Sequence, residues 1–593
     1  MMFFSAYLGS DAGLPSWRQA LTGHARWLRF ELRIDMRRLN DGRTLALGWL
    51  EHADTVAQRD GNRADKADFA ARLLFSDGVA APGDANAATL TLSPSSDEVR
   101  IAVPLATPQQ VCYVRTEHGY VFADDLRLFP RLTNADLDER AVYALLHYGA
   151  VPPSLTIYEG VRRIPGGHEL QLRGDAAPVC VPVYQGADRP HPSGATLPPE
   201  QWLAETLDAM LVRVPRSAVL YFSGGVDSSL MAARLRGLGR SDVRLVNYSF
   251  GLDDAESRLA ARIASHLGFE YHQVPYHPRE VGHVLERLGR DYAFPFCDLS
   301  AIPTNILVHG SLPLTGDAHT VVEGTGADGA FGLSREYQKW QRVYRIPRPI
   351  RQWLGQVYRR LRLWQYDSVL ERAGRLLSRS THQPPGHAMV SQNALEGVAY
   401  TTPERVQRQL REAIQTRMEV MSEGMEPLAR LSILDLVWVC AGRMAPKSFD
   451  PLRGRGIRAF YPFLQPSMVS GSAALPWDVK CANGEKKALL KQLLVRDIPP
   501  EWVYRPKSGF TRPAHAVFAL DGVQDYLNDV VLSPRNPLLD YCHAATVRRL
   551  VARARTRPLG AGAYNFLWAL TFASGWLQQS PRAAAPSPAP VPA

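Results

Sequence analysis

The 593-residue chain has little of what marks metal, redox or membrane proteins. It has six cysteines, and no two of them have the C-x-x-C spacing. This scarcity argues against a zinc site and a dense disulfide framework, and it predicts a reducing, cytoplasmic compartment. No apolar run reaches the roughly 18 residues that a membrane-spanning helix needs. The apolar stretch Met1–Leu8 lacks the basic residues of a signal peptide, so we expect none.

A strong excess of charge of one sign is also missing. The net charge of +10 is spread over a long chain, of which 21% is charged and 46% hydrophobic. Such a composition is typical of a globular protein, and the length predicts more than one domain. The balance allows an anionic partner such as ATP, but it does not call for nucleic acid.

The Gly-Lys-Ser/Thr loop of the Walker type is absent, and another glycine loop stands in its place. The apolar segment Ala218–Phe222, an expected strand, precedes Ser223-Gly-Gly-Val-Asp-Ser-Ser229, and apolar residues at helical spacing begin at Leu230. Backbone N–H groups at a helix start attract phosphate, and glycines let the backbone approach it. Asp227 is suited to hold Mg²⁺. The alternative is an ordinary Gly/Ser-rich turn, which this order of strand, loop and helix disfavours.

A second glycine loop follows further along the chain. Segments 243–250 and 271–276 and the run from Thr320 predict strands that alternate with helices, which is the pattern of a doubly wound parallel sheet. Ligands of such sheets bind at the carboxyl ends of the strands. Gly324-Thr-Gly-Ala-Asp328 can therefore face the same cleft as the first loop, so that Asp227 and Asp328 share Mg²⁺. A tight turn is the alternative.

The two loops together resemble those of known enzymes. Residues 223–229 resemble the PP-loop of the ATP pyrophosphatases, which split ATP into AMP and pyrophosphate. With the second loop and the Arg-Pro-Lys segment in Val503–Phe510, they resemble the class B asparagine synthetases. Upstream, a predicted hairpin at 111–125, a predicted helix at 139–148 and the turn Pro165–His168 are similar to the glutaminase-like domain of that family.

The resemblance implies an α/β chain with two folded domains. The first is an α+β domain of the Ntn-hydrolase type, and the second is a doubly wound parallel-sheet PP-loop domain with a helical C-terminal part. We expect a degenerate glutaminase-like domain at 1–185, a linker at 186–200, an ATP pyrophosphatase domain at 201–578 and a disordered Pro/Ala tail at 579–593.

The resemblance also implies a two-step reaction that uses ATP and Mg²⁺. A carboxylate attacks the α-phosphate to give an acyl-adenylate and pyrophosphate, and an amine then forms the amide. The implied ATP-binding residues are Tyr221, Ser223, Gly224, Gly225, Asp227, Ser228, Ser229, Phe250, Glu256, Gly324 and Lys487. The implied metal ligands are Asp227 and Asp328, and the implied catalytic residues are Lys507, Asp298 and Thr325.

Several of these residues have an ordinary structural alternative. Phe250 can be a core side chain instead of an adenine contact. Glu256 can be a carboxylate that the helix dipole favours, and Asp298 can be a helix cap. Lys507 can be an exposed lysine in a Pro/Gly loop.

Four departures from the resembled pattern bear on the substrate. The glutaminase of that family uses a cysteine at position 2, and a thioether such as Met2 cannot attack glutamine. The resembled second loop has acids where this chain has Thr325 and Gly329. The resembled pattern also has an aspartate after Pro-Phe-Leu, where this chain has Gln465. These differences indicate a branch in which the substrate brings its own amine.

Runs at 440–450, 461–466 and 484–490 are similar to the lasso-peptide macrolactam cyclases. That branch implies a ribosomally made precursor peptide as substrate and a leader-peptide protease as partner. The freed N-terminal amine would then form an isopeptide bond with an Asp or Glu side chain. The alternatives are an ammonia-dependent asparagine synthetase, a β-lactam synthetase-like enzyme, a PP-loop protein acting on RNA, and a non-catalytic scaffold. The arginine-rich segment 335–378 fits either solvated helix faces or a groove for an extended peptide or nucleic acid.

Overall fold

The fold is known from a computed structural model that describes most of the chain. It describes residues 3–39, 41–52, 88–93, 98–133, 136–174, 176–184, 197–250, 254–332, 342–343, 345–363, 369–370, 373–374, 377, 395–422, 427–505 and 513–580. Met2, Lys507, most of the predicted linker, much of the basic segment and the tail from residue 581 lie outside these ranges.

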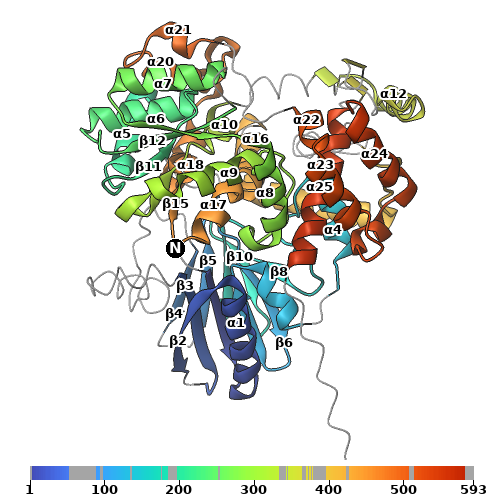
Figure 1. The fold of residues 1–593 in the computed structure, drawn as a ribbon. Coiled ribbons are helices and arrows are strands. Elements are labelled where there is room, and N and C mark those ends of the chain that lie inside the picture. Colours follow the sequence, from blue (N-terminus) through green and yellow to red (C-terminus); the bar gives the residue numbers. More distant parts are fainter. Residues whose placement is uncertain are drawn as a thin grey trace, which may run out of the picture.

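The N-terminal part contains two antiparallel sheets (Figure 1). The first has the order β2-β3-β1-β7-β6-β8, and the second has the order β10-β9-β5-β4. The strands are β1 Phe3–Gly9, β2 Phe30–Arg38, β3 Thr44–His52, β4 Thr89–Ser93, β5 Glu98–Val103, β6 Cys112–Thr116, β7 Gly119–Ala123, β8 Arg162–Arg163, β9 His168–Leu172 and β10 Val179–Pro182.

Strand β1 lies inside the first sheet and is buried along its whole length. Phe4 and Leu8 pack against the second sheet, while Phe3 and Tyr7 face a core that includes Trp17 of helix α1 (Leu14–Leu28). Burial on both faces explains why this strand has no apolar–polar alternation, which is why the sequence pattern did not indicate it. The predicted hairpin at 111–125 is confirmed as β6 and β7.

The predicted parallel sheet is confirmed, with the order β13-β12-β11-β14-β15. Its strands are β11 Val219–Tyr221, β12 Arg244–Ser249, β13 Tyr271–Pro275, β14 Thr320–Val322 and β15 Arg458–Phe460. Leu220 faces the core formed with α5, α6 and α7, and Val219 faces the core formed with α8 and α9. The direction in which successive strands are added reverses between β11 and β14, and ligands of doubly wound sheets bind beside such a point. Strand β15 was not predicted, since a three-residue strand carries too little pattern.

Helices cover the parallel sheet and build the C-terminal part (Figure 1). Those around the sheet are α5 Pro199–Leu211, α6 Val226–Gly237, α7 Ala255–Leu267, α8 Pro278–Asp291, α9 Ala301–Ser311, α10 Ala327–Phe331, α16 Pro427–Leu434, η6 Asp435–Met444, α17 Pro446–Arg453, α18 Pro466–Ala474, α19 Trp477–Lys480, α20 Ala488–Leu494 and α21 Pro500–Val503. The others are α4 Glu139–Tyr148, as predicted, α12 Arg348–Arg360, α15 Glu404–Ser422, α22 Ala514–Phe518, α23 Asp521–Tyr526, α24 Ala544–Thr556 and α25 Ala561–Gln579. No helix of the described chain is both long enough and apolar enough to cross a membrane.

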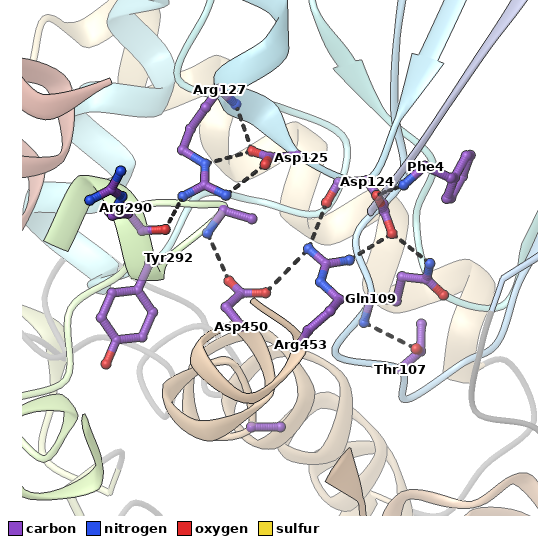
Figure 2. Close-up of polar contacts among 12 residues, drawn as sticks. Phe4, Thr107, Gln109, Asp124, Asp125, Arg127, Arg290, Tyr292, Asp450 and Arg453 are labelled. Atoms are coloured by element: carbon purple, nitrogen blue, oxygen red, sulfur yellow. Dashed lines mark hydrogen bonds and ion pairs between the residues drawn. The ribbon is translucent and has the colours of Figure 1, made fainter. Parts of the chain in front are cut away.

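A buried charged network joins the N-terminal sheets to the parallel-sheet part (Figure 2). Arg453 at the end of α17 pairs with Asp124, which follows β7, at 2.6 Å, and both side chains are almost completely buried. Arg127 pairs with Asp125 at 2.6 Å and donates to the carbonyl oxygens of Gly289 and Arg290 at 3.0 and 2.5 Å. These carbonyls belong to the last turn of α8, where such groups lack helical partners. The two parts therefore share one polar core.

Candidate functional site

The first glycine loop connects β11 to α6 in a conformation that its sequence requires. Gly224 has a φ of +65°, and a Cβ atom there would lie 2.9 Å from the Cα atom of Ala260 in α7. Any side chain would therefore be both strained and blocked. The Ser228 hydroxyl accepts from the Ser223 N–H at 3.2 Å and donates to the Gly225 carbonyl at 3.2 Å. The loop is thus folded tightly around the start of α6.

Ser229 is the last residue of this loop and lies in the first turn of α6. The hydroxyl oxygen of Ser229 is buried and makes no hydrogen bond within the described residues. A buried hydroxyl without a partner costs free energy, which a phosphate oxygen arriving at the loop would recover. This hydroxyl therefore fits the predicted binding of ATP phosphates at the start of α6.

The second glycine loop packs directly on the first. A Cβ on Gly324 would lie 3.2 Å from both Asp227 Cβ and Met231 Cε. Gly326 has a φ of +110°, and a Cβ there would lie 3.0 Å from the backbone carbon of Phe463. Glycine at both positions lets the loop after β14 fit between α6 and the segment after β15. The two loops meet at the carboxyl edge of the sheet, as predicted.

Lys487 lies between the two aspartates that the sequence predicts as metal ligands. Its Nζ is 2.6 Å from Asp227 Oδ2 and 2.9 Å from Asp328 Oδ1. The lysine side chain is only 13% exposed, and the backbone of Lys487 is left-handed just before α20 begins. Burial works to lower its pKa, but the two carboxylates outweigh burial and raise the pKa above its ordinary value. The structure thus brings a first-loop acid, a second-loop acid and a distant lysine to one point.

The donor set at this point fits Mg²⁺ bound together with phosphate. Within the described ranges, no group of three or more His, Cys, Asp or Glu side chains could hold a metal by itself. Two carboxylates are the usual protein share for Mg²⁺ when phosphates and waters supply the remaining ligands. Asp227 and Asp328 meet that requirement.

A carboxylate that the motif comparison did not single out lies behind the second loop. Glu323 is the residue after β14, and it accepts a hydrogen bond from Thr325 Oγ1 at 2.6 Å and another from Ser448 Oγ of α17. Ser448 also contacts the hydroxyl of Tyr461 at 2.9 Å. Burial raises the pKa of Glu323, although both hydroxyls and Lys447 work against that shift. Its place directly before Gly324 could have pointed to Glu323.

Asp298 is held by α17 and by its own loop. Its carboxylate lies 3.2 Å from Lys447 Nζ and accepts from the N–H and hydroxyl of Ser300 at 2.9 and 2.6 Å. Ser300 has the N-cap position of α9 but no capping side-chain bond, and Asp298 accepts from the Ser300 N–H, so Asp298 caps the turn that leads into α9. Burial works against its charge, but Lys447 and Ser300 lower its pKa. The catalytic role of Asp298 stays a prediction.

Three other predicted residues have clear partners. Glu256 in the first turn of α7 pairs with Arg505 through two contacts of 2.7 Å. Arg505, two residues before Lys507 in the sequence, is thereby held against the first turn of α7. The Tyr221 hydroxyl contacts Ser311 of α9 at 3.0 Å, inside the core. Phe250 packs edge-on against Tyr248, with ring centroids 5.2 Å apart. The roles of Tyr221, Phe250, Glu256 and Lys507 in ATP binding or catalysis stay predictions.

A parallel sheet with two facing glycine loops defines a class of α/β proteins that bind phosphate groups at the strand ends. Comparison with known families specifies the class further. The family model described as asparagine synthase matches residues 202–578. Because this match covers more than half of the chain, the protein belongs to the asparagine synthase family.

Curated relatives agree with this family at low identity. A putative glutamine-hydrolyzing asparagine synthetase of Mycobacterium tuberculosis is 23% identical over 396 residues, which are 64% of this chain and 59% of the relative. Glutamine-hydrolyzing asparagine synthetase 1 of Bacillus subtilis is 21% identical over 411 residues, 66% of this chain and 62% of the relative. The chain thus spans about three fifths of the length of these relatives.

Proposed function

We propose that this protein forms an amide bond by activating a carboxylate with ATP. The single observation that carries the proposal is the meeting of Asp227, Asp328 and Lys487 where the two glycine loops join. Two acids and one cation at the carboxyl ends of adjacent parallel strands suit a Mg–nucleotide whose phosphates are being split. Membership of the asparagine synthase family supports the same chemistry.

In this proposal each part of the site has one task. The start of α6 and the hydroxyl of Ser229 bind the phosphates of the substrate ATP. Asp227 and Asp328 would hold Mg²⁺, which would supply positive charge against the phosphates. Lys487 adds a fixed positive charge where pyrophosphate departs. Lys507 lies outside the described residues, and we propose that it stabilises the charge that develops at the α-phosphate.

We further propose that carboxylate and amine belong to one precursor peptide, so that the product is a macrolactam of the lasso-peptide type. Joining two groups of one bound molecule avoids the entropy cost of bringing a separate amine to the site. The thiol of Cys112 in β6 is poorly suited to attack glutamine, because burial raises its pKa to about 12 and keeps it protonated. Partnership with a leader-peptide protease belongs to the same proposal.

An ammonia-dependent asparagine synthetase is the second candidate, and one observation favours it. Gln465, which replaces an aspartate of the resembled pattern, is 2% exposed and stands at the N-cap position of α18. Its side chain makes no capping hydrogen bond there and instead donates from Nε2 to the Tyr461 carbonyl at 3.3 Å, so it is directed at the backbone after β15. The replacement of an aspartate by Gln465 is therefore weaker evidence against free aspartate as the substrate.

The test supplies ATP and Mg²⁺ with synthetic peptides that have a free N-terminal glycine and one internal Asp or Glu. Pyrophosphate release reports carboxylate activation, and mass spectrometry reports the loss of one water on ring closure. A peptide with an acetylated N-terminus should release pyrophosphate without closing a ring. A peptide with Asn in place of the acid should do neither. Parallel reactions contain aspartate and ammonium.

Each outcome decides between the candidates. Ring closure only in the free peptide supports the cyclase, whereas activity with aspartate and ammonium alone supports the asparagine synthetase. Carboxylate-independent pyrophosphate release would contradict both. Asp227→Asn should lower pyrophosphate release about a hundredfold or more, because the phosphates lose a metal ligand. The matched control is Asp242→Asn, since Asp242 pairs with Arg240 away from both loops.

A further inference from the structure

A cavity lies between the N-terminal part of the chain and helix η6. Its empty volume is about 710 Å³, with open space at its mouth included. The N-terminal part contributes lining residues between Val103 and Gly166, and the parallel-sheet part contributes Phe294, Pro295, Val437, Trp438 and Gly442. The acids, the lysine and the glycine loops of the candidate site do not line this cavity, so its chemistry has to be considered separately.

The wall of this cavity is mainly apolar and contains one cation. Leucine, isoleucine, valine and proline side chains form most of it, together with the rings of Phe294 and Trp438. Arg163 of β8 is the only charged side chain among the described residues that line it, and no acid is present there. An apolar pocket with a few placed polar groups, at the junction of two parts of a chain, is the usual form of a small-molecule site.

Arg163 is a cation that is held by neutral groups. It donates to three successive backbone carbonyls at 151–153, at 2.7 to 3.0 Å, and to Gln110 Oε1. These four hydrogen bonds leave one Nη1–H for a ligand. Burial lowers the pKa of Arg163 to about 10, and the Cys112 thiol alone works against that shift. The guanidinium therefore stays charged at neutral pH, while no described carboxylate balances it.

Two neutral donors line the same cavity and have no acceptor among the described residues. Gln110 uses its amide oxygen to bind Arg163, so its amide nitrogen is left to donate, and the residue is only 9% exposed. The indole Nε1–H of Trp438 is buried without a hydrogen bond. Buried donors without acceptors are rare and cost free energy. Holding the loop at 151–153 explains where the guanidinium lies, but it does not explain these two donors.

We propose that this cavity binds a carboxylate that is carried on a small apolar body. The carboxylate accepts from Arg163, Gln110 Nε2 and Trp438 Nε1, and the apolar wall covers the rest of the ligand. A free amino-acid derivative and the C-terminal residue of a peptide share this chemistry. The site does not depend on the proposed amide-forming function.

Isothermal titration calorimetry on the full-length protein tests the class of ligand. N-acetyl-L-leucine supplies the carboxylate, and N-acetyl-L-leucinamide is its uncharged match. We expect the acid to bind and the amide to bind at least about tenfold more weakly, because the charge-assisted hydrogen bonds are lost. The tripeptide acetyl-Gly-Gly-Leu, with a free or an amidated C-terminus, distinguishes the two sources. Tighter binding of the free tripeptide assigns the site to a chain end, and tighter binding of N-acetyl-L-leucine assigns it to a small acid.

Gln110→Glu tests the need for negative charge from within the chain. The new carboxylate would pair with Arg163, so the melting temperature should rise and binding of N-acetyl-L-leucine should fall at least about tenfold. Trp438→Phe keeps an apolar ring but removes the N–H, and it should weaken binding of the acid while leaving binding of the amide unchanged. The matched control is Gln273→Glu, at an exposed position of β13, which should change neither affinity.

Three results would each overturn the carboxylate site. The first is equal affinity of the original protein for the acid and the amide. The second is no measurable binding of N-acetyl-L-leucine or the free tripeptide at about 10 mM. The third is a Gln110→Glu variant that melts no higher than the original protein and binds the acid as before. These measurements need neither ATP nor turnover, so their failure is separate from a failure of the proposed function.

Discussion

At the scale of single residues, the contacts of Lys487 bear most directly on how the candidate site is held together. It comes from a segment far along the chain, yet it lies between the acids of both glycine loops. Without a cation at this point, Asp227 and Asp328 would repel each other. Lys487 therefore keeps the two loops together before Mg²⁺ and ATP arrive.

Lys487→Met should make the loops depend on Mg²⁺ for their stability. We expect a lower melting temperature in EDTA than for the original protein, because two acids face each other without the lysine. Addition of Mg²⁺ should then raise the melting temperature more in the variant, since the ion binds an otherwise unpaired site. Differential scanning calorimetry in EDTA and in millimolar Mg²⁺ measures both effects. Lys486→Met, one residue earlier, is the control, and equal Mg²⁺ shifts in the two variants would contradict this role.

Some of these residues could be predicted from the sequence, and others could not. Asp227 and Asp328 follow strands, so the rule of carboxyl ends predicts their meeting. Lys487 was included only because its segment resembles the family, since nothing local indicates its partners. Glu323 was not singled out because it lies just before the glycine loop, and its contacts with Thr325 and Ser448 arise only from the fold. Lys507 lies outside the described residues, so its role stays a prediction.

At the scale of elements, the two loops depend on glycines in left-handed conformations. Gly326 has a φ of +110° and lies against the backbone of Phe463 after β15. It fixes the distance between the second loop and the outer strand of the sheet. The loop cannot keep this path if a side chain is present.

Gly326→Ala should destabilise the protein and displace Asp328. A side chain in this backbone region costs about 1–2 kcal/mol, and the close contact with Phe463 adds to the loss. We expect chemical denaturation to begin at lower denaturant and the stabilisation by Mg–ATP to shrink. Gly237→Ala is the control, because Gly237 ends α6 with open space around it and an ordinary backbone. Similar denaturation curves for the two variants would contradict the argument.

Elements with strong local signals were predicted and weak ones were not. Helix α4 starts after the cap Asp138 and ends at left-handed Gly149, and both signals are local. Strand β15 is three residues long and pairs with β14 across a long separation, which no local pattern reports. Strand β1 is buried on both faces, so its continuous apolar run resembles other buried segments.

At the scale of the whole molecule, helix α17 connects the site to the N-terminal sheets. Its first turn carries Lys447 and Ser448, which contact Asp298 and Glu323. Its last turn carries Asp450 and Arg453. Asp450 accepts from the N–H of Ala293, and Arg453 pairs with Asp124 (Figure 2). The short, fully buried helix α17 therefore contacts both the candidate site and the N-terminal sheets.

Titration of Asp450 at this junction should make the stability of the folded protein depend on pH. Burial raises its pKa to about 6, although Arg453 and the N–H of Ala293 work against the shift. In the unfolded chain an aspartate titrates near about 3.9. Between these values the folded protein keeps a proton that the unfolded chain has lost, so stability falls as pH rises from 4 to 6, by about 3 kcal/mol in all.

Asp450→Asn removes this titration and keeps an acceptor for Ala293. Relative to the original protein, the variant should therefore gain stability as the pH rises from 4 to 6.5. Denaturation midpoints across this range provide the measurement. Asp478→Asn, at an exposed position of α19, is the control. Parallel pH curves for Asp450→Asn and the original protein would show that Asp450 does not titrate in this range.

The pairing of Arg453 with Asp124 limits how this architecture can be recombined. Both side chains are almost completely buried, and they come from opposite sides of the junction. An N-terminal region transplanted from a relative without a matching acid would remove the 2.6 Å partner of Arg453 and leave Asp450, at 3.5 Å, to balance its buried charge. Breaking a buried pair in this way costs several kcal/mol. Since Ser448 and Arg453 belong to the same helix, such a chimera would also disturb the partners of Glu323. Exchanges between family members should therefore move α17 together with the sheets on which it rests.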